Sequence, residues 1–566
     1  MPDESSVKWS LTDDGVLTIS GTGAIREYGW SNYPWNDYKE NDIKSVVIGE
    51  GVTNIPGQAF WCTRKMTSVS IPASVTTIGN MAFTECGIES GTNLVVTIAD
   101  GSSLASIGGE AFRESKLASI TIPASVTTLS PWAFYGCENL TAITVEDGNA
   151  NYSSDGGVLY SKDKSELILY PAGKTDTSFE IPATVTAISG ATFSGCTSIT
   201  AFTVAAGNTA FSAEDGVLFN IDKTTLVKYP AGKAGTSYEI LASVTTIGET
   251  AFAQCANLTS VTIGNNVTTI GTDAFAECGN LTSVTIGNSV ESLGMGAFAS
   301  CTSLATVDFG SNVKITTIAN DVFANCLALT SISLPAGVTR IVEYAFFRCN
   351  ALATVTLNSN PYIDTDAFMG ISPAPQVTMN LTANPAGGAN WMTFCSTYGN
   401  FQADANTQVF KAELSNTGAL TLHEVTDKIV DKGQGVILKS TGNPMMTQTM
   451  SDSLNPETNN LFGVDQFEGF DIGGSCAYVL NNGSQGVGFY LLAAGKTLGY
   501  GKAFLRFTGG STAPSFLGFS ETTGINAVNG SEFMVNGSDV YNLKGQRVAQ
   551  PTKGLYIVNG KKFVIK

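Results

Sequence analysis

One stretch of the sequence decides the fold, and its clearest copy reads Leu258-Thr-Ser-Val261-Thr-Ile263-Gly-Asn-Asn-Val267-Thr-Thr-Ile270-Gly-Thr-Asp-Ala274-Phe275-Ala-Glu-Cys278. The next copy begins 23 residues later, at Leu281. The Thr-rich and β-branched first third predicts a short strand, and the middle apolar pair predicts a corner. The Ala, Phe and Cys side chains of the Ala-Phe-x-x-Cys end are expected to fill the core at the opposite wall of the coil. A coil this short cannot bury its apolar face alone, so the copies must stack, with parallel strands about 4.8 Å apart.

The Phe of the Ala-Phe pair, or of its variants, marks each copy. Successive markers are 22 to 29 residues apart, apart from two steps of 59. The markers are Phe60, Phe83, Phe112, Phe134, Phe193, Phe252, Phe275, Phe298, Phe323, Phe346 and Phe368. Recurrence at such a constant interval indicates a repeat architecture.

Both 59-residue steps contain the same insert, which adds 36 residues to the 23-residue period. The inserts cover about residues 146–175 and 205–234, and each ends on a Tyr-Pro-Ala-Gly-Lys motif. In the first insert, two apolar runs flank Lys162-Asp163-Lys164. We therefore expect a hairpin that turns at these residues and projects from the stack of coils.

This pattern resembles the 23-residue leucine-rich repeat of Treponema-type and BspA-like surface proteins of Bacteroidetes and spirochaetes. The resemblance covers about residues 45 to 380, and it implies a mostly β solenoid with a parallel sheet on one face. The segment from Trp9 to Ala24, with Tyr33-Pro34-Trp35 downstream, is similar to the cap that precedes the repeats in that family. A cap is physically required because the first coil otherwise presents a bare apolar end and an open strand edge.

The repeat period ends after Phe368, and four parts are expected. They are an N-terminal cap at residues 1–45, repeats at 46–381, a β-sandwich at 382–525 and a small C-terminal β-hairpin module at 526–566. Short strands are predicted in the tail, separated by Gly, Asn and Ser. They lie at residues 408–414, 435–439, 477–480, 487–492, 533–535, 539–543, 554–558 and 562–566. Asn536-Gly537 and Asn559-Gly560 are preferred tight-turn pairs.

The last stretch, with Val540 to Val548 and Gly554 to Lys562, resembles C-terminal sorting modules of exported Bacteroidetes proteins. That resemblance implies export, and the chain is expected to be secreted or held at the cell surface. The opening Met-Pro-Asp-Glu-Ser-Ser has neither a basic nor an apolar signal region, so we expect the signal peptide to be missing from this sequence.

Composition limits the partners of the 566-residue chain. Its net charge is −18, and charged residues make up only 14% of it. Such a surface repels nucleic acid and anionic lipid headgroups. Because no stretch approaches the roughly 20 apolar residues that a bilayer span needs, we expect no membrane span.

Residues able to carry chemistry were each weighed against a structural role. Nine of the 11 cysteines follow the marker Phe, and we expect buried free thiols that act as small apolar residues rather than a disulfide ladder. The single histidine, His423, is expected to be exposed on a strand. The loop from Asp147 to Asn151 has only the first ligand positions of a calcium loop, because Tyr152 replaces its turn Gly.

Two further motifs were considered. Gly-Lys pairs at Lys174, Lys233 and Lys496 lack the earlier glycine of a phosphate loop. The acidic cluster Asp465, Glu468 and Asp471 is interpreted as a solvated loop rather than a glycosidase pair. We expect no catalytic residue, no metal and no cofactor.

The remaining candidate site is the outward face of the repeat strands. One position per strand points outward and is nearly always a small hydroxyl residue. The proposed binding residues are Ser70, Thr121, Thr262, Thr285, Asp308, Ser333 and Thr356, and Thr97, Thr144 and Thr203 share the column. Asp308 is expected to be the one break in it. In leucine-rich repeats this sheet is the usual partner-binding face.

The first hypothesis is therefore a non-enzymatic, exported binding protein that adheres to a host or bacterial protein or glycan, which is what the BspA-like resemblance implies. A structural surface spacer without a specific ligand is the second hypothesis. An enzyme housed in residues 382–525 is the third.

Overall fold

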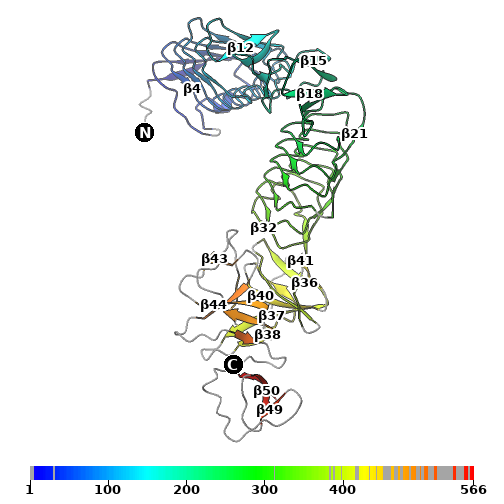
Figure 1. Ribbon diagram of the computed structural model, residues 1–566. Coiled ribbons are helices and arrows are strands. Elements are labelled where there is room, and N and C mark those ends of the chain that lie inside the picture. Colours follow the sequence, from blue (N-terminus) through cyan, green and yellow to red (C-terminus); the bar gives the residue numbers. More distant parts are fainter. Residues whose placement is uncertain are drawn as a thin grey trace. The chain divides into compact units, whose positions relative to one another are not determined.

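The structure is a computed structural model (Figure 1). It describes residues 6–29, 32–311 and 313–381, most of residues 392–449, and the backbone of further strands between residues 384 and 565. Apart from one 3-10 turn, η1 (Asn36–Tyr38), the regular elements of these residues are β-strands. The chain forms two compact units, residues 1–307 with 322–327 and residues 308–321 with 328–566.

Long strands of the repeats form one wall of the coils in the first unit. The first sheet has the order β1-β2-β3-β5-β7, antiparallel between β1 and β2 and parallel thereafter. Its members are β1 (Lys8–Leu11), β2 (Val16–Ser20), β3 (Ser45–Ile48), β5 (Ser68–Ile71) and β7 (Val95–Ile98). Further parallel pairs are β9 (Ser119–Ile122) with β11 (Ala142–Val145), β15 (Ser178–Ile181) with β17 (Ala201–Val204), and the run β21 (Ser237–Glu239), β23 (Ser260–Thr262) and β25 (Ser283–Ile286).

Two-residue strands form a second wall, at the corner that the Val-x-x-Ile pattern predicts. They pair in parallel in the order β10-β8-β6-β4. These strands are β4 (Asn54–Ile55), β6 (Thr77–Ile78), β8 (Ser106–Ile107) and β10 (Thr128–Leu129), with β16 (Ala187–Ile188), β22 (Thr246–Ile247), β24 (Thr269–Ile270) and β26 (Ser292–Leu293) farther along. In nearly every case the second residue is buried, so each corner contributes one aliphatic side chain to the core.

The marker Phe residues stack on one another along the core. Ring centroids are 5.2 Å apart for Phe60 with Phe83 and for Phe83 with Phe112, at interplanar angles of 16° and 8°. The same geometry recurs for Phe252, Phe275 and Phe298, at 4.7 Å and 5.1 Å. In these runs of successive coils the rings lie one above another, which agrees with the predicted solenoid.

The inserts correct one prediction. In the first, β12 (Tyr152–Asp155), β13 (Val158–Ser161) and β14 (Glu166–Leu169) form two antiparallel hairpins, and the predicted turn lies between β13 and β14. However, β14 pairs in parallel with the corner strand β16. Because Leu159 and Leu167 are fully buried, the insert belongs to the core and does not project from it. The second insert, β18 (Phe211–Glu214), β19 (Val217–Asn220) and β20 (Thr225–Lys228), repeats this arrangement against β22.

Each insert is in fact a coil with a tyrosine in the marker position. Tyr170 lies 6.0 Å from Phe193, and Tyr229 lies 5.2 Å from Phe252. Each 59-residue step thus consists of a 36-residue coil, ending on the tyrosine, and an ordinary 23-residue coil. The search for Phe alone missed these two coils.

Side-chain hydrogen bonds connect successive coils. Thr282 Oγ1 donates to the carbonyl of Thr259 at 3.0 Å, and Thr259 Oγ1 donates to Thr236 at 3.1 Å. The cysteine thiols make an analogous contact with the backbone carbonyl of the marker Phe in the preceding coil. Sγ–O distances are 3.1 Å for Cys86 to Phe60, 2.9 Å for Cys137 to Phe112 and 2.9 Å for Cys278 to Phe252. The ten described cysteines are free, and nine are buried, but these thiols also act as weak donors and not only as apolar residues.

The second unit continues with the same coil geometry. Its long strands β29 (Ser331–Leu334), β31 (Thr354–Leu357) and β33 (Gln376–Asn380) are parallel, and its corner strands are β28 (Thr317–Ile318), β30 (Arg340–Ile341) and β32 (Tyr362–Ile363). β33 then pairs antiparallel with β41 (Met445–Thr449), followed by β36 (Asn400–Ala403) and β39 (Ile429–Val430). The tail therefore covers the last repeat strand edge.

A second sheet of this unit has the order β34-β35-β40-β37-β38. Its strands are β34 (Asn384–Ala386), β35 (Ala389–Phe394), β40 (Val436–Ser440), β37 (Thr407–Leu414) and β38 (Leu420–Glu424). Backbone pairing also defines the sheet β42-β47-β44-β45-β48, the pair β43 with β46, and the sheet β49-β50-β51. These are β42 (Leu461–Gly463), β43 (Phe470–Asp471), β44 (Cys476–Gly483), β45 (Gly486–Leu491), β46 (Thr497–Leu498), β47 (Ala503–Phe507), β48 (Phe516–Gly518), β49 (Val540–Asn542), β50 (Gly554–Val558) and β51 (Lys561–Ile565).

Several tail predictions can be checked against these strands. The strands predicted near 408–414, 435–439, 477–480 and 487–492 are present, and the pair Val558 with Lys561 flanks the expected Asn-Gly turn. The strand predicted at 533–535 and the turn at Asn536-Gly537 lie outside the described residues. The sandwich, the sorting module and the four domain boundaries stay predictions.

Candidate functional site

Register places the predicted binding residues in common columns on the long-strand wall. Thr262 lies beside Thr285, and Ser333 lies beside Thr356. The pairing also sets Ser70 beside Thr97 and Thr121 beside Thr144. Asp308 lies exposed on β27 (Thr306–Phe309). All seven proposed residues are exposed except Thr356, which is half-buried.

The outward hydroxyls differ from those one column away. Thr259 and Thr282 use their hydroxyls to hold adjacent coils together. Within the described part of the chain, the hydroxyls of Thr121, Thr262 and Thr285 make no such bond. Their donors and acceptors face solvent, so they can form hydrogen bonds with a ligand.

The column also contains residues that the sequence search missed. Val47 lies beside Ser70, Glu180 beside Thr203 and Glu239 beside Thr262. Asp308 is therefore not the one break in the column. The two glutamates were missed because their strands follow the tyrosine-ended coils, which the Phe search skipped.

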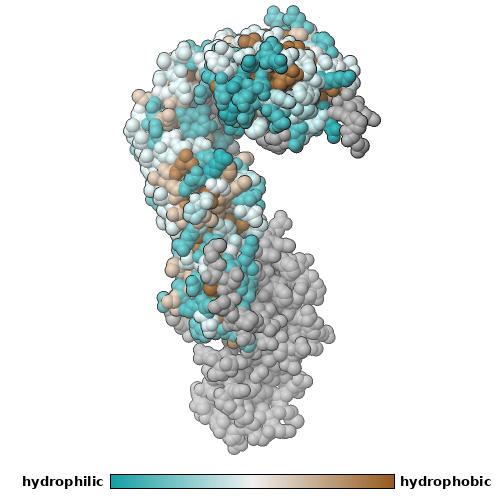
Figure 2. Space-filling view, turned by 180° about the vertical axis from the view of Figure 1, so that it is seen from behind, coloured by the Kyte–Doolittle hydropathy of each residue, from teal (hydrophilic) through white to brown (hydrophobic). Residues whose placement is uncertain are grey.

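Figure 2 shows mostly hydrophilic and near-neutral side chains, with hydrophobic ones in small separate patches. Among the described residues no helix has the length and apolarity to cross a membrane.

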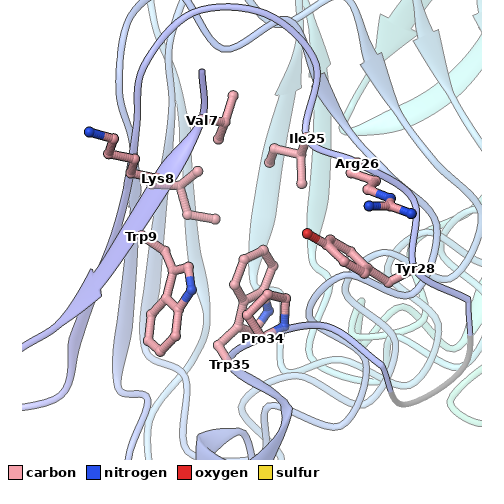
Figure 3. Close-up of a pocket in the computed structure, with 9 residues that line it drawn as sticks. Val7, Lys8, Trp9, Ile25, Arg26, Tyr28, Pro34 and Trp35 are labelled. Atoms are coloured by element: carbon pink, nitrogen blue, oxygen red, sulfur yellow. The ribbon is translucent and has the colours of Figure 1, made fainter. Parts of the chain in front are cut away.

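A second candidate site, absent from the sequence predictions, is a cleft of about 550 Å³ at the N-terminal end of the first unit (Figure 3). It is lined by Val7, Lys8, Trp9, Ile19, Ile25, Arg26, Tyr28, Pro34 and Trp35. Trp35 is only 3% exposed, and its indole donates to the carbonyl of Ala59 at 2.8 Å. Its ring stacks on Phe60 at 5.7 Å, so the cleft lies over the end of the ring column. In the sequence, the only indication of this cleft is the aromatic content of the segment that resembles a cap. The aromatic residues of that segment come together only in the folded chain.

The loop from Asp147 to Asn151, which resembles a calcium loop only in part, has a structural role. The amide of Asn149 donates to the carbonyls of Pro123 and Val126 and accepts from the backbone of Asn151 and Tyr152. This side chain fastens the entry of the first insert, and Asn208 makes the same four bonds in the second.

The lysines of the first two Gly-Lys pairs hold the hairpin turns. Lys174 Nζ donates to Gly156 O at 3.2 Å, and Lys233 Nζ donates to Asp215 O at 2.7 Å. The third, Lys496, lies outside the described residues.

Among the described side chains, the residues considered for catalysis do not come together in one site. His423 is half-buried rather than exposed, and it pairs with Lys411 across β37 and β38. The side chains of Asp465, Glu468 and Asp471 lie outside the described residues. Within the described ranges no group of three or more His, Cys, Asp or Glu side chains has an arrangement that could hold a metal ion.

Burial also keeps several thiols protonated. It raises the pKa of Cys62 to about 11, with a further contribution from the hydrogen bond to Glu85. Burial likewise raises the pKa of Cys137 and of Cys196 to about 12. Because the thiolate is the nucleophile, the raised pKa values disfavour reaction of these three cysteines at neutral pH.

The repeat geometry and the sheet face define a leucine-rich repeat solenoid. The family described as BspA type leucine rich repeat region, in six copies, matches residues 36–154, 172–231, 231–352 and 316–413. The chain belongs to this family, as the sequence resemblance predicted.

Three solved structures of bacterial leucine-rich repeat proteins are similar to this chain. A leucine-rich repeat protein from Eubacterium ventriosum is 26% identical and covers 68% of this chain and 95% of its own, with a TM-score of 0.33. A leucine rich cell surface protein from Faecalibacterium prausnitzii is 26% identical and covers 62% and 87%, with a TM-score of 0.32. A leucine-rich repeat protein from Bacteroides ovatus is 22% identical and covers 65% and 91%, with a TM-score of 0.27. No curated protein matches the chain.

Proposed function

We propose that the chain is an exported, non-enzymatic binding protein that presents the outward face of its long-strand sheet to a protein or glycan at a cell surface. The observation that carries the proposal is the hydroxyl column that includes Thr121, Thr262 and Thr285. These side chains are exposed and make no hydrogen bond within the described chain, and parallel pairing holds their backbone in register.

Family membership supports a repeat protein without enzymatic activity. Similarity to the Faecalibacterium prausnitzii protein, a leucine rich cell surface protein, supports placement outside the cell. A column of exposed hydroxyls favours ligands recognised through many hydrogen bonds, such as proteins and glycans. Glu180, Glu239 and Asp308 add acidic points that favour a partner with basic groups.

The test is a binding screen of the purified chain against matrix proteins and a glycan array. Thr285→Arg places a large cation in the middle of the column, and Asp308→Lys reverses an acidic point. Ser292→Arg is the matched control, because Ser292 is exposed in the same coil but on the corner wall.

We expect Thr285→Arg to weaken binding about tenfold or more and Ser292→Arg to leave it unchanged. If both Thr285→Arg and Asp308→Lys bind like the wild type, the sheet face is not the site. A wild-type chain that binds nothing in either screen would overturn the proposal in favour of a surface spacer.

A further inference from the structure

The N-terminal cleft has a composition that differs from the rest of the surface. Its walls include the rings of Trp9, Tyr28 and Trp35, and its charged lining residues, Lys8 and Arg26, are both basic. The chain as a whole carries a net charge of −18. The cleft is therefore a local positive and aromatic site on an acidic protein.

Buried aromatic residues support the two exposed rings of the cleft. Trp9 is 37% exposed and meets Trp35 edge-on, with ring centroids 6.3 Å apart and an interplanar angle of 72°. Tyr28 meets buried Tyr33 in the same manner, at 5.4 Å and 67°. Tyr33 stacks on Trp35 at 5.4 Å and donates its hydroxyl to Gly57 O at 2.7 Å. A ligand thus finds two partly exposed rings on a rigid base, at little entropic cost.

Polar groups face the space between the rings. Figure 3 shows the Tyr28 hydroxyl and the Trp9 indole nitrogen turned toward the cavity. The Trp9 N–H donates to no other described residue. A ligand with both an apolar face and hydroxyl groups matches this arrangement better than a hydrocarbon does.

Arg26 supplies the charge. Its guanidinium lies 5.4 Å from the centre of the Tyr28 ring, and the side chain is exposed. Neither Arg26 nor Lys8 forms an ion pair with another described residue. In Figure 3 the Lys8 amine points outward from the strand, so Arg26 is the better placed of the two cations. A free guanidinium favours a carboxylate or sulfate, which it binds with paired hydrogen bonds.

We propose that this cleft binds an acidic saccharide, a pyranose unit that bears a carboxylate or a sulfate. The C–H face of the sugar stacks on Trp9 and Tyr28, its hydroxyls bond to the polar groups of these rings, and its anion pairs with Arg26. The volume of about 550 Å³ falls in the range of small-ligand sites and accommodates one or two sugar rings. The cleft lies at the β1 edge of the first sheet, where Trp9 pairs with the buried Ile19, and none of the proposed binding residues of the hydroxyl column lines it. The proposal therefore does not depend on the proposed function of that column.

The test uses the full chain and calorimetric titration with three disaccharides. Digalacturonic acid carries carboxylates, a heparin-derived disaccharide carries sulfates, and lactose is neutral. Trp9→Ala removes a wall, and Arg26→Gln removes the charge while keeping an exposed polar side chain. Trp132→Ala is the control, since Trp132 is a half-buried tryptophan outside the cleft that packs on Tyr135 at 5.4 Å.

We expect at least one acidic disaccharide to bind at least about tenfold more tightly than lactose. Trp9→Ala should weaken that binding about tenfold, and Arg26→Gln should abolish the preference for the acidic sugar. Trp132→Ala and the sheet variant Thr285→Arg should leave it unchanged. Equal binding of lactose, binding that survives Trp9→Ala in a folded chain, or no binding of either acidic sugar would overturn the proposal.

Discussion

The two 36-residue coils, which contain residues 152–174 and 211–233, are nearly the same structure built twice. Both have two antiparallel hairpins, a parallel pairing with the next corner strand and a tyrosine in the ring column. Both are fastened by an asparagine at the entry and by a lysine at the hairpin turn. This agreement shows which contacts build the coil.

Among the buried positions of the two coils, one changes from an apolar residue to a charged one. The register pairs Leu159 with Leu169 in the first coil and Leu218 with Lys228 in the second. Leu169 and Lys228 are each 3% exposed. Lys228 Nζ donates to the carbonyl of Thr250 at 2.6 Å, and burial lowers the pKa of its ammonium group.

The surroundings explain why the second coil tolerates a lysine. Lys228 borders a cavity of about 220 Å³, together with Thr225, Glu249 and Thr250. Leu169 instead packs within the apolar core that includes Cys137 and Leu140. We infer that a buried cation here depends on a local acceptor and on the neighbouring cavity, whose mixed lining includes Thr225 and Glu249, rather than on the coil itself.

The largest effect is expected for Leu169→Lys, which copies the second coil's residue into the first. Within the apolar core around Leu169, the ammonium group loses its hydration with little compensation, so the free energy of unfolding should fall by about 4 kcal/mol. Denaturant titration measures it, with Leu169→Met as the volume-matched control. A loss below about 1 kcal/mol would mean that both coils accept a lysine equally.

The next largest effect tests the similarity of the coils. Asn149→Ala and Asn208→Ala each remove four hydrogen bonds. The carbonyl of Val126 or of Val185 then loses its asparagine donor, whereas the preceding proline carbonyl keeps a backbone N–H donor. Each substitution should reduce the free energy of unfolding by about 2–3 kcal/mol. Hydrogen exchange at residues 149–152 and 208–211 should show the loss locally. Very different losses in the two coils would show that the asparagines are not equivalent.

A smaller effect of opposite sign is expected for Lys228→Leu, which makes the second coil resemble the first. Replacing a buried cation by an apolar side chain should raise the free energy of unfolding by about 1–2 kcal/mol at pH 7. The pKa of Lys228 is lowered in the folded chain, so the unfolded chain binds more protons between that pKa and about 10.4. Wild-type stability should rise with pH through this window relative to Lys228→Leu, as denaturation at several pH values would show. A constant difference between them would contradict the burial of a titrating lysine.

The smallest effect concerns the two tyrosines. Tyr170 donates its hydroxyl to Asp176 at 2.7 Å, whereas the Tyr229 hydroxyl has no hydrogen-bond partner within the described residues. Tyr170→Phe should therefore lower the free energy of unfolding by about 1 kcal/mol, and Tyr229→Phe should change it little.

The Tyr170 effect should also depend on pH. The hydrogen bond from Tyr170 is the main cause that lowers the pKa of Asp176, so its contribution is present above about pH 3.9 and is lost as pH falls through the lowered pKa. Thermal denaturation at pH 7 and near pH 2 checks both statements. Equal losses for the two Phe variants would remove this distinction between the coils.

Much of the fold could be predicted, because each 23-residue copy carries the same apolar pattern and stacking is the only way to bury it. The outward column could also be predicted at Thr262 and Thr285, where the strand motif is regular. The positions of Glu180 and Glu239 in this column were not predicted, because a tyrosine replaces the marker Phe in the coil before each of them. The insert was expected to project, since its hairpin pattern does not reveal that β14 pairs with a corner strand.

The sequence alone determined the repeat, the class of solenoid and the direction of most strand side chains, because a periodic apolar pattern dictates which face is buried. Only the tertiary structure decided which hydroxyls hold the coils together and which remain for a ligand. It also decided that Trp9, Tyr28 and Trp35 share one cleft and that Lys228 has an acceptor in the core. These are contacts between residues from different elements, and no local pattern encodes a distance between side chains that meet only when the coils stack.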